Sequence, residues 1–223
     1  MIRFENTKVF NVDGALRGMR NPLQSWDNSD SFVCGDLDDC IGCERRDECV
    51  DVRSNDLVLF GENDMQLAMK LRKAGSDHRK YLRQIFVCVD ITAPEYWWKE
   101  YSTYKVGTCE NSTSTMHTIH KEKFTLDHFS TDHLSDHAKA VLSYLIVNLN
   151  LYRDAYLETK DKAHWYNIIE SLPMSYLYRR TSTMNYENLV NMYHARKHHK
   201  LDEWHTFCEW VRFLPYSELI IGE

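Results

Sequence analysis

The stretch Ile85-Phe86-Val87-Cys88-Val89, continued by residues 90–101, decides most of what the sequence says about the fold. Five consecutive apolar residues, rich in β-branched and aromatic side chains, predict a strand buried on both faces. Pro94 suits the first turn of a following helix, where its missing N–H would have no partner in any case. We therefore expect a buried strand that leads directly into a helix carrying Trp97, Trp98 and Tyr101.

The chain before this strand has a less regular pattern. Residues 2–12 alternate loosely between apolar and polar side chains and predict one or two short strands. Residues 13–56 contain glycines, a proline and an Asn-Ser-Asp run, which predict a loop-rich stretch with a cysteine-rich insertion at about 27–56. A helix capped by Asn63 or Asp64 is expected to run to Ala74 and to stop at Gly75.

The C-terminal half has the apolar spacing of helices. Ser135 is expected to cap a long helix whose buried stripe comprises Ala138, Val141, Leu142, Leu145, Leu149, Tyr152 and Tyr156. Further helices are expected around 165–172, after a cap at Asn185, and around 204–211. The predicted fold class is α+β: one helix-rich domain over residues 1–223, with a small, mostly antiparallel sheet.

Charge and composition exclude several classes of protein. The chain has 223 residues, with 27 Lys and Arg against 33 Asp and Glu, so its net charge is −6. This balance argues against binding to polymeric nucleic acid or to a membrane surface. The longest uncharged stretch, residues 140–152, is too short to span a bilayer. An early-charged N-terminus and seven cysteines, an odd number, indicate a reduced cytoplasmic protein.

Four cysteines form the most conspicuous local cluster: Cys34, Cys40, Cys43 and Cys49. Four thiolates within sixteen residues can close on zinc, and the two-residue spacer between the middle pair is that of a metal knuckle. The five-residue outer spacers are unusual and the surroundings are acidic, so a loop with free thiols is the alternative. A four-thiolate site would be closed and structural.

Basic side chains offer candidate anion contacts. Arg196 and the pair Arg179 and Arg180 could grip a phosphate through the planar guanidinium fork. The cations that follow Arg196 suit the C-terminus of a helix electrostatically. The histidine pairs lack the intervening acid of a zinc-hydrolase helix, and no glycine-rich phosphate loop is present. An acidic protein with such local basic points favours a small anionic ligand.

The segment 90–115 resembles the flavin-dependent thymidylate synthases. That family has a buried strand, a helix opened near Ala-Pro, and the signature Arg-His-Arg-x-x-Ser-x-Asn-Glu-x-Ser-x-Arg. Aligned without gaps from Ala93-Pro94, the signature falls on Thr103, Tyr104, Lys105, Thr108, Glu110, Asn111, Thr113 and Thr115. A cation and hydroxyls are kept, but the first and last arginines and the histidine are replaced.

Two further segments extend the resemblance to about residues 60–212. His78 lies before Ala-Pro at the distance of the family's flavin-contacting histidine. Leu172-Pro173, then Asn185, Leu189 and Arg196, match the family's Leu-Pro and Asn-x3-Leu-x6-Arg, whose arginine meets the nucleotide. The family's arginine just before Leu-Pro is missing, and Arg179 or Arg180 is expected to substitute for it.

The resemblance implies a homotetramer that binds FAD across subunit interfaces. It also implies methylation of dUMP at C5 with methylenetetrahydrofolate, with NADPH reducing the flavin, as a step of nucleotide biosynthesis. The expected catalytic residues are Arg196 and Lys105. The expected cofactor contacts are His78, Tyr104, Glu110, Asn111 and Asn185. The expected substrate contacts are Lys99, Thr113, Ser114, Arg179, Arg180 and Arg196.

A second hypothesis belongs to a different class of function. Replacing an arginine fork by threonine removes charged hydrogen bonds worth roughly 1.5–3 kcal/mol each, which could abolish turnover and keep the fold. The alternative is therefore a flavin- or nucleotide-binding protein without methyltransferase activity, in which a zinc-stapled loop serves as an interaction module.

The cysteine cluster yields a direct test. If zinc holds the loop together, Cys40→Ser combined with Cys43→Ser lowers the melting temperature, because metal binding contributes to folding. Elemental analysis of the unaltered protein should then find one zinc per chain. If the melting curve is unchanged and no metal is bound, the loop contains free thiols.

Overall fold

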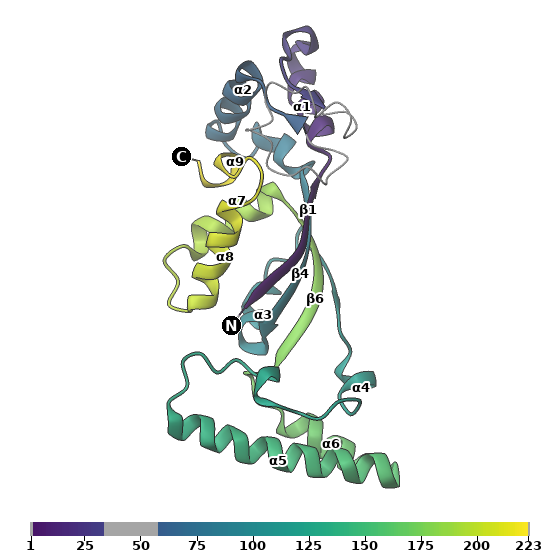
Figure 1. Cartoon of the computed structure of the whole chain (residues 1–223). Coiled ribbons are helices and arrows are strands. Elements are labelled where there is room, and N and C mark those ends of the chain that lie inside the picture. Colours follow the sequence, from purple (N-terminus) through teal and green to yellow (C-terminus); the bar gives the residue numbers. More distant parts are fainter. Residues whose placement is uncertain (1, 34–57, 223) are drawn as a thin grey trace, which may run out of the picture. The chain divides into compact units, whose positions relative to one another are not determined.

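The computed structural model describes residues 2–33 and 58–222, which form two compact units (Figure 1). Unit 1 comprises residues 2–5, 90–104 and 110–182, and unit 2 comprises residues 6–33, 58–89, 105–109 and 183–222. Most of the expected cysteine-rich insertion, with all four of its cysteines, lies outside the described residues. The α+β class is confirmed, with a small antiparallel sheet among many helices.

The main sheet has four strands in the order β1-β4-β6-β5. Its strands are β1 (Arg3–Phe10), β4 (Phe86–Pro94), β5 (Cys109–Ser112) and β6 (Leu177–Asn185). The predicted strand is confirmed as β4, but Phe86 and Cys88 are only half-buried, so burial of both faces is not complete. Pro94 ends this strand and is the N-cap of α3 (Glu95–Tyr101), not part of its first turn. The sequence reasoning missed β6, because adjacent arginines interrupt its apolar pattern. A second, antiparallel pair consists of β2 (Phe32–Val33) and β3 (Val58–Leu59).

Unit 1 holds α3 (Glu95–Tyr101), α4 (Thr115–Thr118), η6 (Leu126–His128), α5 (Asp136–Thr159) and α6 (Lys162–Ser171). The Ser135 hydroxyl caps α5 as expected, accepting a hydrogen bond from the backbone N–H of Ala138 at 3.3 Å. A buried cluster joins α5 and α6 through Ile119, Phe124, Phe129, Leu142, Ile146, Leu149 and Ile168. The predicted buried stripe of α5 is wrong at Val141, which is 58% exposed.

Unit 2 holds α1 (Val12–Arg20), η1 (Asn21–Leu23), η2 (Trp26–Asn28), α2 (Glu62–Lys73), η5 (Arg79–Arg83), α7 (Tyr186–Arg196), α8 (Asp202–Arg212) and α9 (Glu218–Ile221). The loop expected from residue 13 onward is wrong for α1. Two glycines disfavour a helix there, but burial of Val12, Ala15, Leu16 and Met19 on one face outweighs that cost. No helix within residues 2–33 or 58–222 has the length and apolar character needed to cross a bilayer.

The N-terminus of α2 is capped from a distant part of the chain, so the expected caps are wrong. The carboxylate of Asp30 accepts hydrogen bonds from the backbone N–H groups of Asn63 at 2.9 Å and Asp64 at 3.1 Å. Gly61 occupies the N-cap position itself. The sequence pattern could not reveal this cap because the acceptor lies more than thirty residues upstream.

A buried ion pair joins α1 to α2. Arg20 and Asp64 are 5% and 0% exposed, and the Arg20 Nε donates to Asp64 Oδ1 at 2.6 Å. The Ser29 hydroxyl and the Ser31 backbone N–H donate to the other carboxylate oxygen, at 2.6 and 3.1 Å. Burial alone raises the pKa of Asp64, but the hydrogen bonds from Ser29, Ser31 and Arg20 together hold it below its usual value.

This arrangement predicts a strong and pH-dependent effect of Asp64→Asn. Removing one partner leaves the Arg20 charge buried and unpaired, so the free energy of unfolding should fall by about 3 kcal/mol at neutral pH. Because the folded-state pKa of Asp64 is lowered, the stabilisation is present above the unfolded pKa and is lost as pH falls through the folded value. Urea unfolding should therefore show the two proteins converging in acid.

The exposed Asp27 offers the matched control, since Asp27→Asn removes a carboxylate nearby in the sequence. If Asp64→Asn lowers the free energy of unfolding no more than Asp27→Asn does, the buried ion pair contributes little to stability.

Candidate functional site

In unit 1, Arg180 of β6 contacts an aromatic ring and two carboxylates. Its guanidinium carbon stands 4.3 Å from the centroid of the Trp98 ring on α3. Its Nη1 donates to Glu110 Oε2 at 2.6 Å and to the Ser102 hydroxyl at 3.3 Å, and Nη2 lies 3.9 Å from Glu95 Oε2. The buried Nε has no hydrogen-bond partner within the described residues. The structure thus brings together two predicted site residues, Arg180 and Glu110, as a pair.

Arg179 faces a different set of carboxylates. Its Nη2 donates to Asp90 Oδ2 at 2.8 Å, and its Nη1 lies 3.6 Å from Glu5 Oε2. The hydrogen bond to Asp90 raises the pKa of Arg179. The Thr181 hydroxyl donates to the other Asp90 oxygen at 2.5 Å. Both arginines expected to replace the family's missing arginine are therefore already paired with acids.

The aromatic side chains of α3 pack against one another, and Trp98 among them contacts Arg180. The ring centroids of Trp97 and Tyr101 are 4.9 Å apart, and those of Trp97 and Trp98 are 5.0 Å apart. The Tyr101 hydroxyl lies 2.5 Å from that of Ser182. Burial raises the pKa of Tyr101, and burial, followed by Glu95, raises the pKa of Tyr178 to about 12. These phenols stay protonated at neutral pH.

The remaining predicted residues of unit 1 lie on β5, on the segment after it, and on or just after α3. The backbone N–H of Thr113 donates to the carbonyl of Arg179 at 2.9 Å and ties this segment to β6. Ser114 caps α4 through the backbone N–H of His117. Asn111 is exposed, Tyr104 is half-buried, and the Lys99 ammonium lies 4.0 Å from the Met174 sulfur.

In unit 2, Asn185 and the segment 105–109, which includes the predicted Lys105, are held together. Asn185 and Asn188 form a reciprocal capping box at the start of α7, each side-chain oxygen accepting the other's backbone N–H. The Asn188 amide also donates to the Val106 carbonyl at 2.7 Å. Gly107, with φ +78°, lies so close that a Cβ would meet both asparagine side chains at 3.0 Å. Lys105 is exposed on this segment.

A second ionic cluster of unit 2 was missed by the sequence reasoning. Glu187, in the first turn of α7, accepts hydrogen bonds from Arg79 at 3.1 Å and from Arg83. Burial alone raises the pKa of Glu187, but these two arginines hold it below its usual value. The predicted flavin contact His78 is exposed and directly precedes η5, which carries both arginines. The sequence did contain a signal for this cluster: Arg79 and Arg83 are spaced one helical turn apart.

Arg196 ends α7 and stacks on a tryptophan ring of α8. Its guanidinium carbon lies 4.6 Å from the centroid of the Trp204 ring on α8. Trp204 is fully buried, whereas Arg196 is half-buried. Stacking on a buried ring holds the planar fork in one orientation, which favours two-point contact with an oxyanion.

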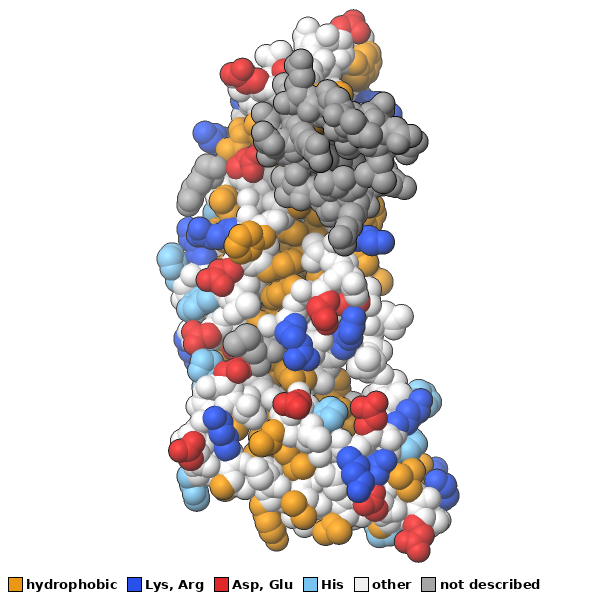
Figure 2. All heavy atoms as spheres, viewed as in Figure 1, with side chains coloured by type: hydrophobic (Ala, Val, Ile, Leu, Met, Phe, Trp, Pro, Cys, Tyr) orange, Lys and Arg blue, Asp and Glu red, His pale blue; other side chains and the backbone are white. Residues whose placement is uncertain are grey.

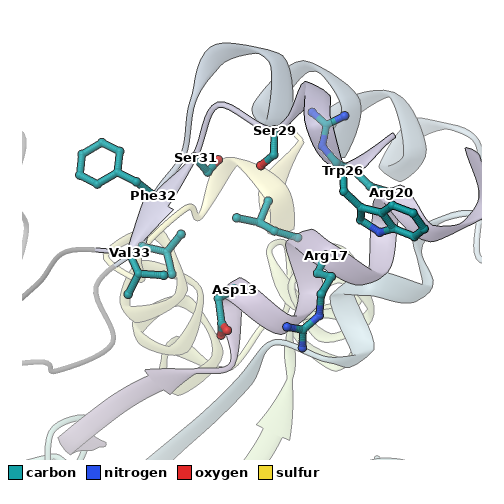
Figure 3. A pocket seen from close by; sticks show the side chains of 10 residues that line it. Asp13, Arg17, Arg20, Trp26, Ser29, Ser31, Phe32 and Val33 are labelled. Carbon is teal, nitrogen blue, oxygen red and sulfur yellow. The ribbon is translucent and has the colours of Figure 1, made fainter. Parts of the chain in front are cut away.

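A separate pocket of unit 2 involves none of the predicted site residues. It encloses about 250 Å³ and is lined by Asp13, Leu16, Arg17, Arg20, Trp26, Ser29, Ser31, Phe32, Val33 and Val58. Figure 3 shows Arg17 and Trp26 on one side of it and Phe32 and Val33 on the other. Arg17, Arg20 and Trp26 thus contribute to the wall of a pocket.

The described parts of the chain offer few side chains for metal binding or for thiol chemistry. Residues 2–33 and 58–222 contain no cluster of three or more His, Cys, Asp or Glu side chains able to hold a metal ion. Cys34, Cys40, Cys43 and Cys49 lie outside this range. Burial raises the pKa of Cys208 to about 11, so this thiol stays protonated and unreactive.

The fold is that of the flavin-dependent thymidylate synthases. A crystal structure of flavin-dependent thymidylate synthase ThyX from Helicobacter pylori, complexed with FAD and dUMP, superposes with a TM-score of 0.66 over 99% of this chain and 98% of that chain. A second structure of that enzyme with FAD and dUMP gives a TM-score of 0.63 over 99% and 97%. Sequence identity is 16% in both cases. No family model and no curated protein matches the sequence.

The contact between Gly107 and the capping box gives a testable prediction. Gly107→Ala forces an L-residue to a positive φ, which costs about 1–2 kcal/mol, and also pushes its Cβ against Asn185 and Asn188. Gly75→Ala is the control, since Gly75 has φ +104° but no atom within 4 Å of its Cβ position. Urea unfolding should show a larger loss of stability for Gly107→Ala. Equal losses of stability in the two variants would mean that the side chains of Asn185 and Asn188 move aside at no measurable cost.

Proposed function

We propose that this protein is a flavin-dependent thymidylate synthase-like enzyme that methylates C5 of dUMP reductively. In this proposal methylenetetrahydrofolate is the one-carbon donor, NADPH reduces the flavin, and the reaction serves nucleotide biosynthesis in the cytoplasm. One observation carries the proposal: the chain shares its fold from end to end with an enzyme whose structures hold FAD and dUMP. The signature-like segment at 103–115 supports it independently.

Several cations are candidates for the nucleotide phosphate. Arg179 and Arg180 are each paired with two carboxylates, so an incoming phosphate would have to displace them. Arg196 stacks on the Trp204 ring, and Lys105 is exposed. Following the family resemblance, we assign a phosphate contact to Arg196 and a supporting one to Lys105, with Lys99, Thr113 and Ser114 as further substrate contacts.

The residues available for the flavin fit a planar, partly apolar cofactor. When bound, FAD would supply hydride chemistry at the uracil ring and remove the need for a cysteine nucleophile. We assign the isoalloxazine to His78 and Tyr104, which offer rings, and the polar groups of the cofactor to Glu110, Asn111 and Asn185. The Asn185 amide oxygen is already used in the cap, so its contact with cofactor would come from the amide nitrogen.

A second function is favoured by the pairing of Arg180 with Glu110. If that pair persists when a nucleotide binds, two groups needed for the substrate and the cofactor neutralise each other. The protein would then bind flavin or nucleotide without methyl transfer, and a zinc-stapled loop formed by the four cysteines would serve as an interaction module.

A visible spectrum of the purified protein, with and without added dUMP, tests the proposal most directly. A flavin spectrum that shifts on addition of dUMP is expected for the enzyme. Thymidylate formation from dUMP, methylenetetrahydrofolate and NADPH then separates it from the non-methylating alternative. Colourless protein that takes up no added FAD and ignores dUMP would contradict both the enzyme and the flavin-binding version of the alternative.

Arg196→Ala should weaken dUMP binding at least about tenfold, since one charged hydrogen bond is worth roughly 1.5–3 kcal/mol. The melting temperature should fall only slightly, because a partly exposed cation–π contact contributes about 1 kcal/mol. Arg212→Ala is the matched control: Arg212 also ends a helix and lies 5.7 Å from the Tyr193 ring. Equal dUMP affinity of the two variants in titration calorimetry would remove Arg196 from the site.

His78→Ala should release FAD while leaving the fold intact, because the side chain is exposed. The measurement is the ratio of flavin to protein after gel filtration. A variant that keeps one FAD per chain would show that His78 does not hold the cofactor.

A further inference from the structure

One face of helix α1 forms a wall of the unit 2 pocket. The side chains on this face follow the three- and four-residue spacing of a helix, and they are Asp13, Leu16, Arg17 and Arg20. The pocket encloses about 250 Å³. That volume holds roughly eight water molecules at about 30 Å³ each, and it lies below the roughly 300–1,000 Å³ of sites for drug-sized ligands. The pocket therefore fits a small metabolite.

Arg20 holds the walls of this pocket together. Its Nε donates to Asp64, its Nη1 donates to the Ser25 carbonyl at 3.1 Å, and its Nη2 donates to the Asn28 carbonyl at 3.0 Å. These bonds fasten the turn that carries Trp26 against α1 and α2, so the pocket is preformed. All three guanidinium nitrogens are already used by the protein, which leaves ligand binding to other side chains.

Asp13 and Arg17 are the charged side chains of the lining that stay available. Both are exposed, and neither forms an ion pair or a side-chain hydrogen bond with another residue within 2–33 or 58–222. They lie four positions apart on α1, which places their Cβ atoms about 5–6 Å from each other. In Figure 3 both charged groups lie at the same edge of the pocket. An acid and a base so close together suit a ligand with two opposite charges on neighbouring atoms.

The rest of the lining is mainly apolar. Leu16 and Val58 are buried, and the Trp26 ring is half exposed beside them. The Trp26 Nε1 already donates to the Asn21 side-chain oxygen at 2.9 Å, so this ring offers an apolar surface and no free donor. An apolar group of the ligand would bury surface here without leaving a polar group unpaired.

We propose that this pocket binds a zwitterionic α-amino acid with a large apolar side chain. The Arg17 guanidinium donates two hydrogen bonds to the ligand carboxylate, and the Asp13 carboxylate accepts from the ligand ammonium. The ligand side chain packs against Leu16, Val58 and Trp26. A purely anionic ligand would be repelled by Asp13, and a purely cationic one by Arg17. No residue of this site is assigned to FAD or dUMP, so the inference is independent of the proposed function.

Titration calorimetry of the full chain, free of FAD and dUMP, tests the ligand class. L-Phenylalanine or L-leucine should bind saturably, with one molecule per chain. Three analogues each lack one feature: 3-phenylpropionate the ammonium, phenethylamine the carboxylate, and L-alanine the large side chain. Each should bind at least about tenfold more weakly than phenylalanine. No saturable binding of either amino acid, or equal affinity for 3-phenylpropionate, would overturn the proposal.

Two variants test the assigned contacts. Arg17→Ala and Asp13→Asn should each weaken phenylalanine binding at least about tenfold, and both should fold, because the side chains are exposed. Asp13→Asn should also narrow the preference for phenylalanine over 3-phenylpropionate, which a merely structural role would not change. Lys8→Ala and Asp77→Asn remove exposed charges of unit 2 outside the pocket and are the matched controls. Variants that bind no more weakly than these controls would contradict the assignment.

Competition separates this pocket from the nucleotide site. Phenylalanine should raise the melting temperature with or without bound flavin, and neither FAD nor dUMP should displace it. Displacement by FAD or dUMP would place the pocket within the nucleotide site and overturn the proposal. Protein that takes up no flavin should still bind phenylalanine, so the two proposals can fail separately.

Discussion

The reciprocal hydrogen bonds between Asn185 and Asn188 are the constraint on which much of the candidate site depends. They end β6 and start α7 at a fixed residue, and Asn188 also ties down the backbone at Val106. Because α7 is a regular helix, the cap sets the direction in which Arg196 emerges at its far end. One pair of amide side chains thus positions both Lys105 and Arg196, the two residues assigned to the phosphate.

Several arginines of the described residues join separate segments within a unit by pairing with carboxylates. They are Arg20, Arg79, Arg83, Arg179 and Arg180. A carboxylate neutralises a guanidinium and competes with a phosphate for it. Arg196 is oriented by the Trp204 ring on which it stacks.

Helix α5 carries apolar side chains on a buried face and on an exposed face. Leu142, Ile146 and Leu149 belong to the core of unit 1, whereas Val141 and Tyr144 are exposed. Figure 2 shows hydrophobic side chains gathered on the surface over this helix. The spacing of apolar residues cannot distinguish these two faces, since both satisfy a helical repeat. This is why the sequence assigned Val141 to the core and the structure does not.

The sequence by itself determined the elements whose signals are local. The buried strand, the Ser135 and Asn185 caps, and the α+β class follow from neighbouring residues, and the family resemblance anticipated the fold. Only the tertiary structure revealed α1, β6, the Asp30 cap of α2, and the carboxylates that pair with Arg179 and Arg180. Each of these depends on burial or on a partner more than twenty residues away, and no local pattern encodes which distant side chain will be there.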